Sequence, residues 1–114
     1  MMRLTLPYPP SVNRYWRVAK NGRVYKSAEA EAYAWEVLAA AGGRREPLDG
    51  DIAIDIAVYR PRKVGDLDNI NKALLDSLEG IAYHDDKQIV ELYARRFDDK
   101  DNPRVEVTVR SLAG

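Results

Sequence analysis

The sequence predicts an α+β fold in which two helices cover a mixed β-sheet. Three observations point to it. Residues 51–60 place a large apolar side chain at every second position from 52 to 58, which is the period of a strand, whereas residues 28–41 and 68–79 repeat apolar side chains at helical spacing. Gly and Pro residues separate these segments. The expected order is strand, small hairpin, helix, strand, helix, strand, strand, in a single domain over residues 1–114.

The opening residues predict a strand followed by a hairpin. Residues 2–6 alternate and are stopped by the proline-rich stretch that starts at Pro7. Asn21-Gly22 lies between two short aromatic and basic runs, and both of its residues tolerate positive φ. We therefore expect a small hairpin over residues 15–26.

The first helix is expected over residues 28–41. Ser27 is a favourable N-cap, the segment is rich in Ala, Glu and Leu, and Gly42-Gly43 ends it. One buried stripe should consist of Ala30, Tyr33, Ala34, Val37 and Leu38.

The remaining elements follow from the same periodicities. In the strand at 51–60, the apolar face should carry Ile52, Ile54, Ile56 and Val58. The helix at 68–79 has an apolar seam and ends at Gly80; the seam is formed by Ile70, Leu74 and Leu78. Residues 88–97 and 104–112 predict two strands, and the turn residues at 98–103 indicate that these strands form an antiparallel hairpin.

Composition excludes several classes of site. The chain has no cysteine, so disulfides, thiol nucleophiles and cysteine-based zinc sites are excluded, and its one histidine excludes a histidine-rich metal site within one chain. No apolar run approaches the roughly 20 residues that cross a bilayer, and the opening lacks a signal-peptide pattern. We expect a cytoplasmic protein with no membrane association and no small-molecule cofactor.

The formal net charge is zero, but the charges are unevenly divided. Residues 1–63 hold eleven Lys/Arg against seven Asp/Glu, and residues 64–114 hold seven against eleven. A basic half beside an acidic half suits a metal-dependent nuclease, although so small an imbalance also arises by chance.

The segment around the second helix carries the chemistry. Asp66 and Asp68 are two residues apart, and Lys72 follows Asp68 by one helical turn, about 6 Å along the axis. Two carboxylates converging on one point repel each other unless a cation lies between them, and Mg²⁺ prefers such oxygen ligands. The same spacing is typical of a helix N-cap with a surface ion pair, so both interpretations stay open.

Asp85-Asp86 follows the helix, and its reach limits what it can join. Asp68 to Gly80 spans about 18 Å of helix, and Gly80 to Asp86 spans at most about 20 Å when extended. Asp86 therefore meets Asp68 in the same chain only if residues 81–85 run straight back beside the helix. Otherwise a second subunit completes the site, or Asp86 is a solvated turn residue.

Basic and aromatic residues supply candidate nucleic-acid contacts. Near the hairpin, arginines and a lysine are interspersed with three aromatic residues, Tyr15, Trp16 and Tyr25. Such a combination binds phosphates and stacks on bases. It is equally typical of a hairpin that packs its aromatic side chains and exposes its basic side chains to solvent. His84 is a candidate general base, because histidine is the side chain type whose unperturbed pKa lies near neutrality. A turn histidine beside two aspartates is more often a solvated residue, so we leave His84 out of the predicted site.

Three segments together resemble the RusA family of Holliday-junction resolvases. They are Leu6-Pro7-Tyr8-Pro9-Pro10-Ser11-Val12-Asn13-Arg14-Tyr15, then Asp66-Leu67-Asp68-Asn69-Ile70-Asn71-Lys72, and Asp85-Asp86-Lys87-Gln88-Ile89-Val90. The resemblance implies a RusA-like homodimer that nicks four-way junction DNA symmetrically. It implies that Asp66, Asp68 and Asp86 are catalytic residues that bind one or two Mg²⁺ ions, with Mn²⁺ as a substitute, and that Lys72 is the catalytic lysine.

DNA contacts are expected from a set of basic and polar residues: Asn13, Arg14, Tyr15, Arg17, Lys26, Arg60, Arg62 and Lys63. The alternative hypotheses are a non-catalytic nucleic-acid-binding module, in which the acidic residues only cap and solvate, and a small dimeric scaffold that binds no nucleic acid.

Overall fold

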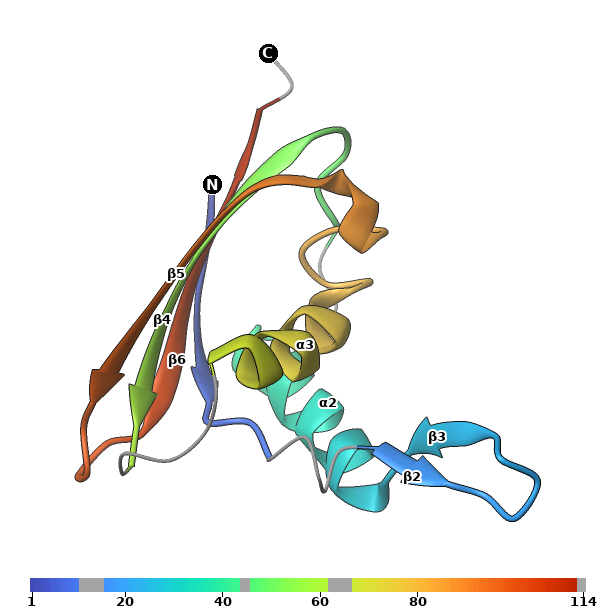
Figure 1. Ribbon diagram of the computed structural model, residues 1–114. Coiled ribbons are helices and arrows are strands. Elements are labelled where there is room, and N and C mark those ends of the chain that lie inside the picture. Colours follow the sequence, from blue (N-terminus) through green and yellow to red (C-terminus); the bar gives the residue numbers. More distant parts are fainter. Residues whose placement is uncertain (11–15, 44–45, 62–66, 113–114) are drawn as a thin grey trace.

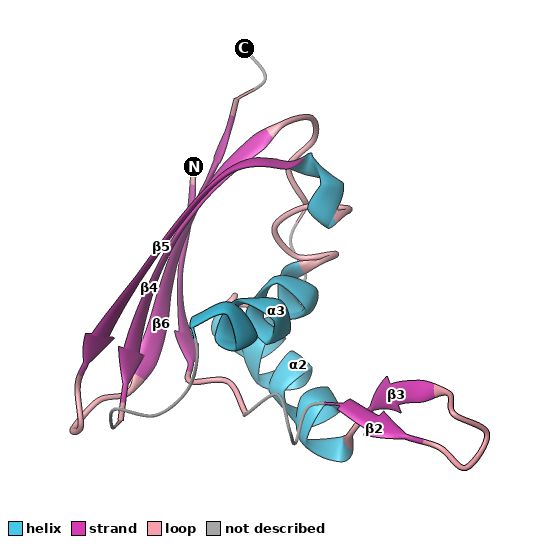
Figure 2. Ribbon diagram, viewed as in Figure 1, coloured by secondary structure: helices cyan, strands magenta, loops and turns pink. Residues whose placement is uncertain are grey.

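A four-stranded mixed sheet with two helices on one face forms the body of the molecule (Figures 1 and 2). The computed structural model describes residues 1–10, 16–43, 46–61 and 67–112, and the side chains of residues 67–71 lie outside that description. The sheet has the order β1-β6-β4-β5, with the strands β1 (Met2–Pro7), β4 (Ile52–Arg60), β5 (Ile89–Asp98) and β6 (Arg104–Ser111). The helices are α2 (Ala28–Ala40) and α3 (Leu67–Leu78). The predicted α+β class with a mixed sheet and two helices is confirmed.

The predicted hairpin is also present, as a separate two-stranded sheet. It pairs β2 (Trp16–Val18) with β3 (Val24–Lys26) in antiparallel register, and Gly22 has a φ of 83° in the turn. The hairpin projects away from the sheet and the helices (Figure 1). Predicted residue Tyr15 lies outside the described residues.

Helix α2 begins and ends as expected. The Ser27 side chain accepts a hydrogen bond from the Ala30 backbone N–H at 3.1 Å, so Ser27 is the N-cap. Within the predicted stripe, Ala30, Tyr33 and Val37 are fully buried, and the Tyr33 hydroxyl donates to the Pro7 carbonyl at 2.8 Å. That bond ties the helix to the end of β1.

Helix α3 packs its apolar seam into the same core. Leu74 and Leu78 are fully buried, and Gly80 has a φ of 84° just after the helix, as predicted for its C-terminal cap. The side chain of Ile70, the third residue of the seam, lies outside the description. Within the described residues, neither helix combines the length and the apolarity needed to cross a membrane.

Strand β4 is confirmed, and it is more deeply buried than predicted. Its predicted apolar face is buried, and Ala53 and Ala57 on the opposite face are buried as well. The reason is its position, because β6 and β5 flank it on its two sides.

The predicted antiparallel hairpin between the last two strands is wrong. Strands β5 and β6 do not pair with each other, because β4 lies between them. Strand β5 runs parallel to β4, with Ile54 opposite Leu92, and β6 runs antiparallel to β4, with Ile54 opposite Val109. Residues 99–103 therefore carry the chain across the end of β4.

Candidate metal centre and nucleic-acid surfaces

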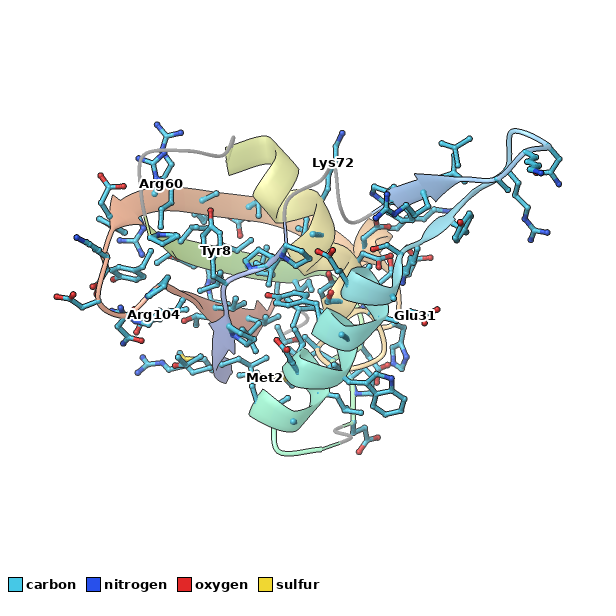
Figure 3. The ribbon with its side chains drawn as sticks, turned by 90° about the horizontal axis from the view of Figure 1, so that it is seen from below. Met2, Tyr8, Glu31, Arg60, Lys72 and Arg104 are labelled. Atoms are coloured by element: carbon cyan, nitrogen blue, oxygen red, sulfur yellow. The ribbon has the colours of Figure 1, made fainter. Side chains whose placement is uncertain are left out.

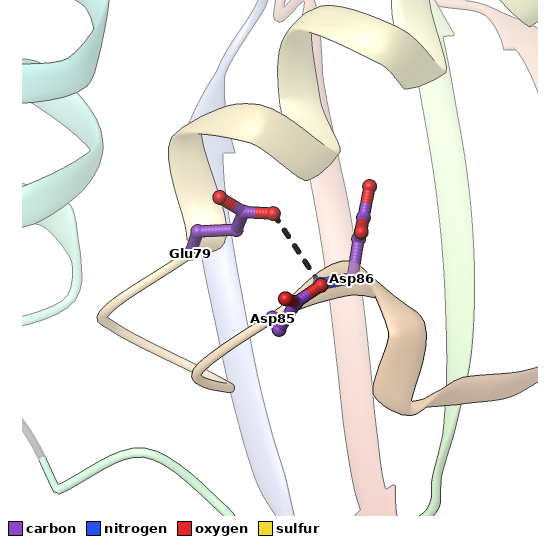
Figure 4. A group of neighbouring side chains, drawn as sticks. All are labelled: Glu79, Asp85 and Asp86. Carbon is purple, nitrogen blue, oxygen red and sulfur yellow. Dashed lines mark hydrogen bonds between the residues drawn. The ribbon is translucent and has the colours of Figure 1, made fainter.

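Three exposed carboxylates meet just after α3. One oxygen from each of Glu79, Asp85 and Asp86 lies within 4.8 Å of the others (Figure 4). Glu79 directly follows the last residue of α3, whereas Asp85 and Asp86 lie at the start of η1 (Asp86–Gln88), a single 3₁₀ turn that leads into β5. The backbone N–H of Asp86 donates to Glu79 Oε1 at 3.3 Å, which links the two segments.

The chain reverses sharply between these segments. Gly80, with its positive φ, donates its N–H to the Tyr83 carbonyl at 2.7 Å. Tyr83 is fully buried, and its hydroxyl donates to the Leu75 carbonyl one turn before the end of α3. Burial raises the pKa of the Tyr83 phenol above its ordinary value, so the hydroxyl stays protonated and keeps this bond at any physiological pH. The reversal thereby holds Asp85 and Asp86 against the end of the helix.

A reciprocal cap fixes the 3₁₀ turn. The Asp85 carboxylate accepts from the Lys87 backbone N–H at 2.9 Å, and Gln88 Oε1 accepts from the backbone N–H groups of Asp85 at 3.0 Å and of His84 at 2.7 Å. The hydrogen bond from the Lys87 backbone N–H lowers the pKa of Asp85, so its carboxylate stays ionised at neutral pH.

The same Gln88 side chain anchors the cluster to the segment before β4. Its Nε2 donates to the carbonyls of Leu48 and Gly50, both at 2.8 Å. One amide therefore joins three parts of the chain: the 3₁₀ turn, the end of the reversal and the approach to the central strand. Asp86 sits on a braced turn rather than on a free loop.

The chemistry of these groups fits a hard divalent cation. All three donors are carboxylates, the ligand type that Mg²⁺ prefers, and they are exposed, so a bound ion would keep water and substrate oxygens in its remaining positions. Like charges this close repel each other, and a cation between them removes that repulsion. Exposed acidic groups also occur without metal, so this arrangement is a candidate.

Asp68, one of the residues predicted to join Asp86, lies at the opposite end of α3 from Asp86. Asp68 is in the first turn of the helix and Glu79 follows its last turn, so the two are about 16 Å apart along the axis. Lys72 is exposed one turn after Asp68 and projects outward from the helix (Figure 3). Asp66 and the side chain of Asp68 lie outside the described residues. The described residues bring Asp86 to Glu79 and Asp85, and the predicted meeting with Asp66 and Asp68 stays a prediction.

Sequence reasoning did not find Glu79. Its position in the sequence could have indicated it, because Glu79 immediately precedes the C-cap glycine. A chain that reverses at that glycine passes the last turn of the helix before it reaches Asp85. The predictions considered only carboxylates before the helix and after the reversal.

Comparison with known proteins agrees with the motifs. The family model described as Endodeoxyribonuclease RusA matches residues 7–110. The chain belongs to the RusA family. It is 34% identical to the crossover junction endodeoxyribonuclease rusA of Enterobacteria phage 82, and 33% identical to the RusA proteins of Escherichia coli strain K12 and Shigella sonnei strain Ss046. Each alignment covers 96% of this chain and 93% of the relative.

In this RusA-family chain, the hairpin carries exposed basic and aromatic side chains. Arg17, Arg23 and Tyr25 are exposed. Lys26 is half-exposed, and its Nζ lies 2.6 Å from Asp76 Oδ2 on α3, so it fixes the base of the hairpin to the helix. DNA contacts from Arg17 and Lys26 stay predictions.

Arg60, which was predicted to contact DNA, holds two strands of the sheet together. It is buried at the end of β4, and its guanidinium contacts Asp98 Oδ1 at the end of β5 at 2.8 Å and 3.0 Å. The Asp98 carboxylate occupies two nitrogens of the guanidinium, and burial leaves little of the rest exposed to a phosphate. Its predicted DNA contact stays a prediction, and the other predicted DNA contacts lie outside the described residues: Asn13, Arg14, Tyr15, Arg62 and Lys63.

His84 does not join the carboxylate cluster of this RusA-family chain. Its Nε2 pairs with Asp49 Oδ1 at 2.9 Å on the exposed segment before β4. This agrees with leaving His84 out of the predicted site.

Proposed function

We propose that this chain is a divalent-metal-dependent endodeoxyribonuclease that resolves Holliday junctions by paired symmetric nicks during DNA recombination and repair in the cytoplasm. Membership of the RusA family carries the proposal, because the family match covers residues 7–110 and the relatives are named crossover junction endodeoxyribonucleases. The carboxylates gathered on the braced turn at Asp86 support it, because they are the ligands that such a reaction needs.

We propose that Asp66, Asp68 and Asp86 hold the cation, one or two Mg²⁺ ions with Mn²⁺ as a substitute. When bound, Mg²⁺ polarises a phosphoryl oxygen and lowers the pKa of a coordinated water. Lys72, exposed on the same helix as Asp68, donates a hydrogen bond from its ammonium group to the phosphoryl group as negative charge accumulates there. The bond from phosphorus to the attacking water oxygen forms while the bond to the 3′ oxygen breaks; the water gives up a proton to solvent and the departing 3′ oxygen takes one up, which leaves a 5′ phosphate and a 3′ hydroxyl.

The proposed enzyme is a homodimer. Two copies related by a two-fold axis present two equivalent sites, which suits two symmetric cuts in a four-way junction. The separation of about 16 Å between the two ends of α3 supports the proposal that Asp86 is contributed by one subunit, and Asp66 and Asp68 by the other.

The β2–β3 hairpin is the proposed DNA-binding arm. It projects from the body, and within residues 16–26 its charged side chains are all basic: Arg17, Lys20, Arg23 and Lys26. Tyr25 is half exposed and offers a ring on which an unpaired base of the junction can stack.

A cleavage assay on a mobile four-way junction, with both nicks mapped, tests the function. Mg²⁺ should support two symmetric nicks, and EDTA should abolish them. Asp68→Asn should abolish cleavage without loss of junction binding, since it removes a charge and keeps the shape, and Lys72→Ala should reduce the rate by roughly a hundredfold. Asp101→Asn, an exposed carboxylate between β5 and β6, is the matched control and should cleave normally.

Two results would reject the assignment. Full cleavage by Asp68→Asn in Mg²⁺ would remove that residue from the site. Binding of junctions without cleavage, unaffected by EDTA, would instead identify a non-catalytic nucleic-acid-binding module of the same fold.

A further inference from the structure

One edge of the sheet is available for further strand pairing. Strand β5 is the last strand in the order, and among the residues that the structure describes no strand pairs with its other edge. It is ten residues long and exposes large apolar side chains: Val90 at 54%, Leu92 at 46% and Tyr93 at 53%. Soluble proteins normally shorten, bulge or charge such an edge, because unpaired backbone groups beside apolar side chains attract another strand.

The two faces of β5 differ in chemistry. Leu92 lies opposite Ile54 in the ladder with β4 and so shares the helix-covered face, whereas Tyr93 lies opposite Asp55 on the other face. Glu91 and Arg95 flank Tyr93 on that second face, two residues away on either side. A bulge at Val90 ends the regular ladder just before Glu91, so the segment available for further pairing starts there.

We propose that β5 pairs antiparallel with β5 of a second copy of this chain, about a two-fold axis at Tyr93. The two four-stranded sheets then join into one sheet of roughly twice the width. This inference rests on the homodimer of the proposed function and names its interface.

The charges of β5 select the register. In antiparallel pairing about a two-fold axis perpendicular to the sheet, opposed residues share a face, so each register is centred on one residue. With Tyr93 at the centre, Glu91 lies opposite the partner's Arg95, and Arg95 lies opposite the partner's Glu91. Leu92 then lies opposite the partner's Ala94 on the helix-covered face, so one register pairs charge with charge and covers the exposed leucine.

The other registers lack this pairing of opposite charges in the middle of the strand. Centring on Leu92 or Ala94 sets neither Glu91 nor Arg95 opposite a charged residue of the partner strand. Centring on Glu91, Arg95 or Arg96 sets like charges opposite each other, which is destabilising. Centring on Phe97 opposes Arg96 and the partner's Asp98, but it uses only the last residues of the strand and leaves Leu92 and Tyr93 uncovered. Asp98 is moreover already paired with Arg60 in its own subunit.

The pairing also bears on the metal site. In an antiparallel pair, the start of each β5 lies beside the end of the partner's β5, and β4 ends at that same end because it runs parallel to β5. Asp86, three residues before β5, is thereby directed towards the end of the partner's β4. The partner's Asp66 and Asp68 follow that end in the sequence, as a site shared between subunits requires.

Charge reversal tests the register in solution. Glu91→Arg and Arg95→Glu, each alone, set like charges opposite each other twice per dimer, and each should weaken dimerisation by roughly tenfold in sedimentation equilibrium. Mixing the two variants should restore the dimer, and so should combining them in one chain. Within a subunit Glu91 contacts Arg110 and Arg95 contacts Asp55, and the combined variant breaks both contacts, so they cannot account for the rescue.

Cysteine crosslinking provides a second measurement that needs no change of charge. The chain has no cysteine, and opposed residues at the centre of an antiparallel pair have Cα atoms about 4.5–5.5 Å apart, within the range of a disulfide. Tyr93→Cys should therefore crosslink into a dimer on mild oxidation. Tyr25→Cys on the hairpin is the matched control, since Tyr25 is 50% exposed, and it should stay uncrosslinked.

The outcomes separate the interface from the nuclease activity. The Tyr93 register would be overturned if the single charge-reversal variants dimerised normally, or if neither the mixture nor the double variant recovered dimerisation. Equal crosslinking of the two cysteine variants would overturn it as well. A wild-type monomer that cleaves junctions would overturn both the interface and the homodimer. A wild-type dimer with rescued variants and no cleavage would support the interface and reject the proposed function.

Discussion

Gln88 offers a sharp test of how the carboxylate cluster is held in place. Its amide joins the turn at Asp86 to the segment before β4: Oε1 accepts from two backbone N–H groups, and Nε2 donates to the carbonyls of Leu48 and Gly50. Gln88→Ala removes all four bonds. Gln88→Glu keeps the accepting oxygen and replaces the donor with a second oxygen that faces both carbonyls.

The expected loss of stability follows from the exposure of these bonds. The bond to Leu48 is partly buried and the other three are exposed, so water recovers much of their energy. At about 0.5 kcal/mol for each exposed bond and about 1 kcal/mol for the partly buried one, Gln88→Ala should cost about 2.5 kcal/mol. For 114 residues that corresponds to a fall of about 10 °C in Tm. Gln88→Glu should cost at least as much, because its carboxylate faces two carbonyls beside Asp85 and Asp86.

Urea unfolding and Mg²⁺-dependent junction cleavage measure the two consequences. Both variants should lower the urea midpoint, and both should raise the Mg²⁺ concentration for half-maximal cleavage by roughly tenfold, because Asp86 loses its bracing. Lys87→Ala, an exposed side chain in the same turn, is the control and should change neither. Wild-type stability and Mg²⁺ dependence in Gln88→Ala would refute the idea that this amide positions the cluster, and a benign Gln88→Glu would show that its donor bonds contribute nothing.

Three further predictions concern the fold. Leu74→Ala should cost about 2–5 kcal/mol in urea unfolding, because the side chain is fully buried between α3 and the sheet; a loss under about 1 kcal/mol would mean that the helix does not pack there. Tyr33→Phe should cost about 1 kcal/mol through the lost bond to the Pro7 carbonyl, whereas the exposed Tyr25→Phe should be neutral in the same assay. The Arg104 guanidinium lowers the pKa of Asp99 below its ordinary 3.8. Asp99→Asn should therefore have a lower free energy of unfolding than the wild type at neutral pH, and this difference should disappear as the pH falls through the folded pKa of Asp99. A difference that grows in acid would contradict this sign.

The elements that the sequence predicted well are those whose causes are local. Ser27 accepts a bond from three residues ahead, and Gly80 adopts a positive φ that other residues avoid, so each marks a helix end whatever surrounds it. The alternating apolar residues of β4 follow from the two-residue period of a strand in the same way. Local rules of this kind needed no knowledge of the rest of the chain.

The pairing of strands has no such local cause. Residues 98–103 have the composition of a hairpin turn, yet they cross the end of β4, a span of two strand spacings or about 10 Å, which a few residues cover as easily as a tight turn. What excludes a direct β5–β6 pair is β4, whose backbone pairs with β5 along one edge and with β6 along the other. Its alternation indicated one buried face only, because the small residues Ala53 and Ala57 on the other face gave no apolar signal.

The same limit applies to the candidate site. The sequence identified carboxylates as the reactive groups because their chemistry does not depend on the fold, but it could not place them, since the direction of the chain after α3 is decided by contacts of Gly80, Tyr83 and Gln88 with distant segments. Those contacts send Asp86 back to the C-terminal end of the helix, and Glu79 becomes its neighbour. A helix of twelve residues is rigid over about 18 Å, so groups at its opposite ends act on one phosphate most simply when a second copy brings them together. Strand β5 begins three residues after Asp86, its charges complement one another, and no described strand pairs with its outer edge, so that edge is where such a copy would bind.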